Sequence, residues 1–174
     1  LIQAPSAARA GFAFLHDRVQ QAAYARIPGE RRSLVHLQVG RLLRARVEAD
    51  AGEAGLFDVV HHLNRGRSLI DDDAERHALA GLNLSAGRRA KASTAYEAAL
   101  ELFEAGAELL GQAASRPDPR LAFELGLEGS ECRYLCGQLD ESLAALAELE
   151  RWAPTAIDRG RVLRLRAVQF ENLT

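Results

Sequence analysis

Apolar residues recur every three or four positions along most of the chain, which is the period of one face of an α-helix. Alanine, leucine, arginine and glutamate, which all favour helix, fill nearly every such segment. One short stretch differs: Phe12–Phe14 reads FAF and could be a single edge strand or the lead-in to a helix. We predict an all-α protein of about eight antiparallel helices, including Leu15–Ile27, Glu30–Ala49, Leu56–Asn64 and Thr155–Asn172.

Turn and capping residues separate these helices. Pro28-Gly29 ends the first helix, because a proline and the residue before it disfavour helical backbone. Asp50–Gly55 contains two glycines and predicts a turn, and Asn64–Gly66 predicts another stop. Asp71–Asp73 places negative charge at the first turn of a helix that runs towards Ala90, where the helix dipole favours it. The second helix carries an apolar stripe wide enough for two neighbours: Leu34, Leu37, Val39, Leu42, Leu43 and Val47.

The stretch GRRAKASTAYEAALELFEAG, which begins at Gly87, permits two interpretations. A phosphate-binding loop needs G-x-x-x-x-G-K-[ST] after a buried strand, so that backbone N–H groups can surround the phosphates. Gly87 stands alone, no strand is predicted before it, and Lys91 is not followed by serine or threonine. The segment therefore predicts the turn and second helix of a helical repeat, with GRRAK as solvated charge on the first helix.

The spacing after Gly87 supports the repeat. Tyr96, Ala99, Phe103 and Gly106 follow it at +9, +12, +16 and +19. This is close to the tetratricopeptide spacing, in which small residues on one helix meet aromatic and small residues on the next.

A second copy of the pattern lies downstream. Gly137 falls at its predicted turn and Pro154 closes it. Ala99 and Ser142 hold equivalent small positions 43 residues apart. The usual repeat has roughly 34 residues, and the proline-containing linker Gly111–Arg120 accounts for the surplus. The other positions of this copy are Leu139, Leu146 and Leu149.

The last predicted helix is the first helix of a third, truncated repeat, with apolar residues that include Ile157. Repeat units depend on their neighbours for burial. We therefore expect an exposed apolar face at Val162, Leu165 and Phe170, and self-association through it.

Composition excludes several classes of protein. The 174 residues are 48% hydrophobic and 26% charged, with a net charge of -2, which predicts a folded protein without general affinity for nucleic acid or anionic membranes. No apolar run is long enough to span a bilayer and no secretory signal opens the chain, so we expect a cytoplasmic protein. The absence of methionine suggests a piece of a longer protein. Cys132 and Cys136 are expected to be small buried residues in a reducing compartment.

The pair His16-Asp17 invites comparison with metal-dependent phosphohydrolases of the His-Asp kind. Such enzymes need a histidine before that pair, whereas His36, His61 and His62 all follow it. Adjacent histidines on a helix lie about 100° apart and share one ion poorly. We therefore expect no catalytic, cofactor-binding or metal-binding residue in this chain, and keep the phosphohydrolase only as an alternative.

Arg159, Arg161, Arg164 and Arg166 form the densest basic cluster. They flank apolar positions of the last helix, and no aromatic residues for base stacking lie between them. We expect them to pack against an acidic neighbouring repeat rather than to bind nucleic acid.

Several strings resemble a known family. The string FAFLHDRVQQAAYARIPGERRSLVHLQVGRLL is similar to the segment that closes the ATPase module of STAND-type signalling ATPases, where a degenerate winged helix gives way to helical repeats. LFDVVHHLNRGRSLI, LAGLNLSAGRRAKASTAYEAALELFEAG and IDRGRVLRLRAVQFENL look like the helical region that follows in large bacterial multidomain sensors. In those proteins a serine/threonine kinase-like domain and the ATPase come first, and GAF and histidine-kinase domains often follow.

The resemblance implies a non-catalytic regulatory segment that relays between an ATPase switch and an output domain, with ATP and magnesium bound only upstream. Its partners would be protein: its own ATPase or kinase domains, or another protein. The regulatory part of a STAND transcriptional activator is a further alternative. We expect residues 1–70 to form a helical adaptor and residues 71–174 a tetratricopeptide-like array.

Overall fold

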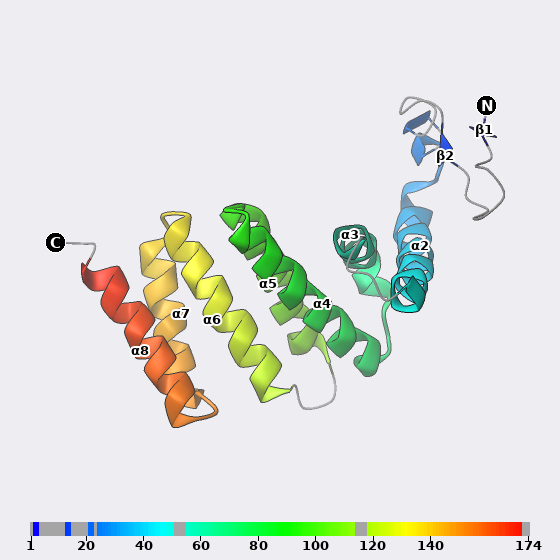
Figure 1. Ribbon diagram of the computed structural model, residues 1–174. Helices are drawn as coiled ribbons and strands as arrows, with labels where there is room; N and C mark the ends of the chain where they lie inside the picture. The colour runs from blue at the N-terminus through cyan, green and yellow to red at the C-terminus, as the bar shows by residue number, and fades with distance from the viewer. Residues whose placement is uncertain are drawn as a thin grey trace.

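The computed structural model describes residues 2–3, 13–14, 21–22, 24–50, 55–113 and 118–171. Its elements are β1 (Ile2–Gln3), β2 (Ala13–Phe14), α2 (Gly29–Asp50), α3 (Leu56–Gly66), the 3-10 turn η1 (Arg67–Leu69), α4 (Asp73–Ala92), α5 (Tyr96–Gln112), α6 (Pro119–Leu135), α7 (Leu139–Trp152) and α8 (Ala156–Glu171). Figure 1 shows them as a row, with α2 and α3 at one end, α4 and α5 in the middle, and α6, α7 and α8 at the other. The predicted all-α helical array is confirmed.

Helix boundaries agree closely with the sequence prediction. The helix after Pro28 begins at Gly29, and α3 ends at Gly66. The side chain of Asp72 caps α4 by accepting a hydrogen bond of 3.0 Å from the backbone N–H of Glu75. Ala13–Phe14 forms a short strand that pairs antiparallel with β1. Of the two alternatives for the FAF stretch, the structure therefore has the strand. Most of the predicted first helix lies outside the described residues.

The three helix hairpins share one close contact. At each crossing a glycine faces a larger side chain, and a Cβ on that glycine would lie between 2.6 and 3.3 Å from it. Both members of the pair recur every 43 residues. The glycine lies on the first helix of two hairpins and on the second helix of the middle one. The identity of each residue therefore varies, but one member of each pair is always small, as close packing requires. The pairs are Gly40 with Leu63, Asn83 with Gly106, and Gly126 with Leu149.

The buried core runs through the hairpins. One cluster extends from Leu37 on α2 to Cys132 on α6 and therefore continues across residue 70. A second, smaller cluster joins Phe123, Leu146 and Val162 across the last three helices. The division into an adaptor (1–70) and repeats (71–174) stays a prediction.

The wide apolar stripe of α2 is only partly covered. Leu37 is buried, but Leu34 is 43% and Leu42 73% exposed. Leu43 and Val47 are half-buried against the same core cluster as Leu37, so the stripe is covered along one side among the described residues. Leu37 lies against Gly66 of α3, and the neighbouring Gly40 lies against Leu63.

The prediction for the face of α8 also needs correction. Val162 is fully buried and Leu165 is half-buried, because both pack into the cluster formed with α6 and α7. Only Phe170 of the three predicted positions is exposed, at 49%. The buried side of α8 instead includes Asp158 and Gln169, whose polar atoms are hydrogen-bonded to neighbouring residues.

Candidate functional site: a groove between α3 and α5

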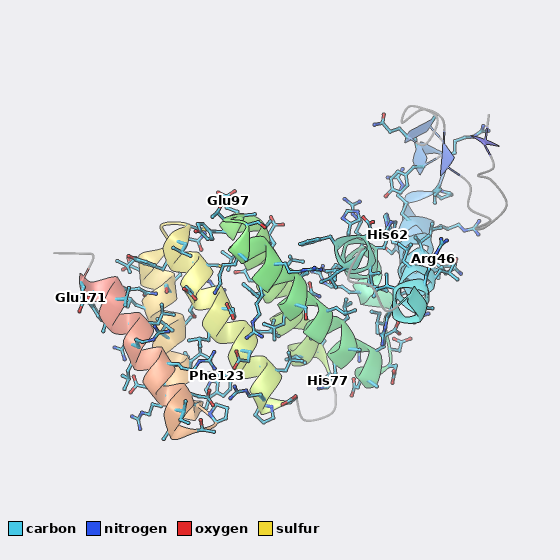
Figure 2. All side chains as sticks on the ribbon, viewed as in Figure 1. Arg46, His62, His77, Glu97, Phe123 and Glu171 are labelled. Atoms are coloured by element: carbon cyan, nitrogen blue, oxygen red, sulfur yellow. The ribbon has the colours of Figure 1, made fainter. Side chains whose placement is uncertain are left out.

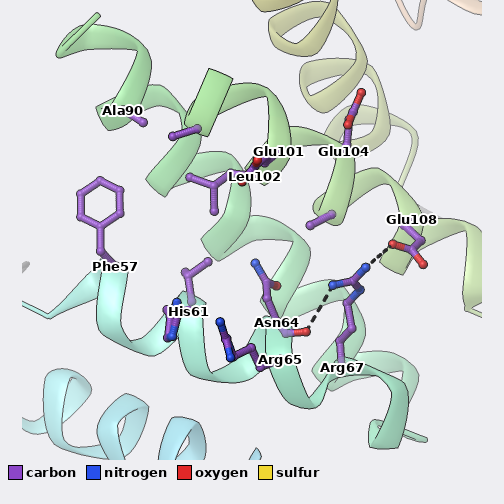
Figure 3. A pocket seen from close by; sticks show the side chains of 13 residues that line it. Phe57, His61, Asn64, Arg65, Arg67, Ala90, Glu101, Leu102, Glu104 and Glu108 are labelled. Carbon is purple, nitrogen blue, oxygen red and sulfur yellow. Dashed lines mark hydrogen bonds and ion pairs between the residues drawn. The ribbon is translucent and has the colours of Figure 1, made fainter. Parts of the chain in front are cut away.

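A groove of about 930 Å³ lies between α3 and α5, two helices that are not consecutive in the chain. Phe57 on α3 and Leu102 on α5 contribute apolar surface, and Phe57 is 50% exposed. Figure 3 shows both side chains directed into the space between the helices. An apolar groove of this size with polar edges is typical of ligand- and peptide-binding sites.

The two sides of the groove carry opposite charge. On α3 and η1 the edge bears His61, Arg65 and Arg67. On α5 it bears Glu101, Glu104 and Glu108 at helical spacings of three and four, which place them on one face. A ligand lying along the groove would therefore meet a basic edge on one side and an acidic edge on the other (Figure 3).

One end of the groove is bridged by an ion pair. Arg67 Nη2 donates to Glu108 Oε2 at 2.7 Å, and Arg67 Nη1 donates to the carbonyl oxygen of Asn64 at 3.3 Å (Figure 3). Glu104 is paired with Arg133 of α6 at 2.8 Å. Glu101 and Arg65 are exposed at the edges, where they can meet charges on a ligand.

An ion-pair network joins α4, α6 and α8 away from this groove. Glu124 of α6 is nearly buried and accepts hydrogen bonds from Arg88 at 2.5 Å and from Arg161 at 2.7 and 3.0 Å. Arg120, one turn earlier, lies 3.0 Å from the same carboxylate. The hydrogen bond from Arg161 lowers the pKa of Glu124, and burial only partly opposes it. The pairing of Arg161 with acidic groups of the preceding repeat agrees with the sequence expectation.

The GRRAK cluster is not simply solvated charge. Lys91 is ion-paired with Glu128 and with Glu131, the latter at 2.8 Å. Burial disfavours the charged form of Lys91, but the hydrogen bonds to these two carboxylates outweigh it and raise its pKa. Arg88 reaches Glu128 as well, at 2.7 Å. These residues face α6 because the sixth helix lies against the fourth, which the sequence pattern does not reveal.

The two cysteines are free and differ in environment. Cys132 is fully buried, which raises the pKa of its thiol to about 11, so it is a poor nucleophile. Cys136 is half-buried, so the expectation that both are core residues holds only for Cys132.

A histidine cluster lies where α3 faces α2, at the position of His62 in Figure 2. His36 Nδ1 and His62 Nδ1 are 3.0 Å apart, so one nitrogen donates and the other accepts. His36 Nε2 is 3.0 Å from the hydroxyl of Tyr24. Burial lowers the pKa of both histidines, and their neighbouring positive charges lower it further. No sequence pattern links residues 26 positions apart, so this pair was missed.

In the part of the chain that the structure describes, no three His, Cys, Asp or Glu side chains are grouped so that they could hold a metal ion. His16-Asp17, the pair that suggested a phosphohydrolase, lies outside the described residues.

The repeat positions of the first predicted copy come together. Gly87 is buried, and a Cβ there would overlap the ring of Phe103, which is 1% exposed. Ala99 is fully buried, and a Cβ on Gly106 would lie 2.7 Å from Leu125 of the next helix. Tyr96 is half-buried at the start of α5. These positions hold helices together and do not line the groove.

Some positions of the second predicted copy are also buried between helices. Gly137 adopts a positive φ of 80° in the turn between α6 and α7. Ser142 and Leu146 are fully buried, whereas Leu139 is half-buried and Pro154 exposed. The tetratricopeptide assignment itself stays a prediction.

Comparison with known proteins gives one relative to report. The chain is 27% identical over 181 residues to hybrid signal transduction histidine kinase G of Dictyostelium discoideum. The match covers 90% of this chain but only 5% of that protein, so the chain spans a small part of its relative. No protein-family profile and no solved structure matches. Every helix in the described ranges is too short or too polar to span a bilayer.

Proposed function

We propose that this chain is a non-catalytic protein-interaction segment of a larger signal-transduction protein. The groove between α3 and α5 carries this proposal, because its apolar surface and its two oppositely charged edges fit a polypeptide. The similarity to part of a signal transduction histidine kinase supports a role in signalling. The finer role, a cytoplasmic relay between a STAND-type ATPase switch and a kinase output, rests on the sequence resemblance alone.

The groove suits an amphipathic helix. Such a ligand would bury its apolar stripe against Phe57 and Leu102, as helices do in hydrophobic grooves. Its acidic flank would face His61 and Arg65, and its basic flank would face Glu101. Complementary charge on both sides fixes the direction of the bound helix and contributes to specificity.

A designed helical peptide tests the proposal by isothermal titration calorimetry. The peptide carries an apolar stripe with glutamates along one flank and lysines along the other, and its control carries the same stripe with lysines along both flanks. We expect the first peptide to bind and the control to bind at least about tenfold more weakly, a difference of about 1.4 kcal/mol. Equal binding of both peptides, or of neither, would refute the proposed groove function.

Two substitutions localise the binding. Phe57→Ala should weaken it, and this variant should stay folded because Phe57 is 50% exposed. The matched control is Phe170→Ala, a phenylalanine that is 49% exposed on α8. Arg65→Glu, which places a negative charge on the basic edge, should abolish the preference between the two peptides.

A further inference from the structure

The 43-residue recurrence gives Ala90 on α4 a counterpart, Arg133 on α6. The backbones of these two residues have the same role. Each carbonyl oxygen accepts the hydrogen bond that ends its helix, from Ala95 N–H at 2.9 Å and from Gln138 N–H at 2.8 Å. The two helices therefore place these residues in the same way, although one side chain is a methyl group and the other ends in a guanidinium group.

The same shift pairs His61 on α3 with Glu104 on α5, and each of these directly follows a buried core residue. Glu104 is the partner of Arg133, since their side chains form an ion pair of 2.8 Å between α5 and α6. The corresponding residues, His61 and Ala90, both line the groove between α3 and α5 (Figure 3). The groove therefore has a hollow beside Ala90, at the position where the next hairpin holds an arginine side chain.

The charge beside this hollow has the opposite sign from its counterpart. On α5 the residue is an acid, Glu104, and the chain supplies its cation, Arg133. On α3 the residue is His61, and Arg65 lies one turn further along the same edge of the groove. Ala90 carries no charge and cannot supply an anion to them. A ligand carboxylate at this point would form the pair of the next hairpin with both signs exchanged.

We propose that the hollow beside Ala90 receives a glutamate side chain of the bound helix, which pairs with His61 and Arg65. This inference rests on the proposed function of the groove and adds the position that selects the ligand. On the opposite edge, Glu104 and Glu108 are each paired with an arginine of this chain, which weakens their repulsion of the incoming carboxylate. The next hairpin fills the same position with a long arginine side chain, so glutamate fits the hollow better than aspartate.

Two helical peptides test this inference by isothermal titration calorimetry with the whole chain. One is the peptide described above, with glutamates along one flank, and the other has glutamine in place of those glutamates. We expect the glutamate peptide to bind the original chain at least about tenfold more tightly. Ala90→Leu fills the hollow without adding charge and should remove this preference. The control, Ala92→Leu at an exposed position of the same helix, should keep it.

A second variant copies the ion pair of the next hairpin into the groove. Ala90→Arg together with His61→Glu should fill the hollow from within the chain, so the glutamate peptide should bind at least about tenfold more weakly. The next hairpin accommodates this pair at the corresponding positions, so we expect the double variant to fold. Circular dichroism compares its helix content with that of the original chain.

The inference is overturned if the glutamine peptide binds the original chain as tightly as the glutamate peptide, or if the preference survives Ala90→Leu. Undiminished binding of the glutamate peptide to the double variant would also overturn it. These results would leave the groove function standing as long as Phe57→Ala still weakens binding. Failure of both peptides to bind the original chain would instead refute the groove function, and this inference with it.

Discussion

Thr94 and Gly137 occupy the same position in the turns of two consecutive helix hairpins, 43 residues apart, and both have positive φ, 62° and 80°. Their hydrogen bonds match as well. The N–H of the residue after each donates to a carbonyl five residues back: Ala95 to Ala90 at 2.9 Å, and Gln138 to Arg133 at 2.8 Å. This is the pattern that ends helices at a left-handed residue. The same turn is therefore built once on glycine and once on a β-branched residue.

Thr94→Gly should stabilise the protein by about 1 kcal/mol, because a β-branched side chain is strained in left-handed backbone. The hydroxyl of Thr94 contributes only one exposed hydrogen bond, to the carbonyl of Ser93 at 2.7 Å. The reciprocal change, Gly137→Thr, should destabilise by a similar amount. Urea denaturation measures both changes, and a loss of stability in Thr94→Gly would contradict the assignment.

Two glycines of the same helix should respond oppositely to alanine. Gly81→Ala should stabilise α4 by about 0.5–1 kcal/mol, because no atom lies within 4 Å of the new Cβ and alanine favours helix. Gly87→Ala should destabilise by about 1–3 kcal/mol, because its Cβ overlaps the buried ring of Phe103. Thermal unfolding of the two variants compares them directly. If both variants gain stability, the close approach of α4 and α5 is not as tight as described.

Acid should weaken the contact between α2 and α3. His36 and His62 have pKa values below 6.5 in the folded state, so the unfolded chain binds protons first as the pH falls. The stability from this pair is complete above pH 6.5 and is lost as the pH falls from there through the folded pKa values. Around the pair, His61 and Arg65 oppose protonation, whereas Asp58 favours it at His62.

His62→Gln tests this dependence. Glutamine can still hydrogen-bond to His36 but does not titrate, so unfolding free energies should fall less steeply between pH 7 and pH 5 than in the original chain. A comparison at pH 8 gives the packing cost of the substitution separately. If the unfolding free energy falls equally steeply with pH in both proteins, the His36–His62 pair does not cause the pH dependence of stability.

Glu124→Gln should destabilise the array by about 1–3 kcal/mol, because a nearly buried carboxylate that accepts from several arginines is replaced by a neutral amide. The control is Glu148→Gln, whose partner Arg151 is exposed, so its effect should stay below about 0.5 kcal/mol. Thermal unfolding measures the loss of stability in both variants. Equal losses would show that the ion-pair network around Glu124 contributes no more stability than an exposed ion pair.

Much of the fold was readable from local patterns. The helix cap at Asp72 and the helix end at Gly66 could be predicted, because both depend on residues within one turn. The spacing of Gly87 and Phe103 also indicated a contact, since helices joined by a short turn must pack against each other.

The groove was not predicted, although its acidic edge has a regular spacing. Glu101, Glu104 and Glu108 form a visible stripe on α5, but an acidic stripe is usually a solvated helix face. Only the position of α3 beside α5 sets Arg65 and Phe57 opposite that stripe. The exposure of Leu163 and the burial of Gln169 on α8 were likewise decided by which side α7 occupies.

The sequence by itself determined the helices, their ends and the 43-residue recurrence, because these follow from backbone preferences and neighbours a few residues away. The tertiary structure decided the pairings across hairpins: His36 with His62, Glu124 with Arg161, and the two edges of the groove. The reason is that a helical pattern states which residues share a face, but not which other face comes to lie against it.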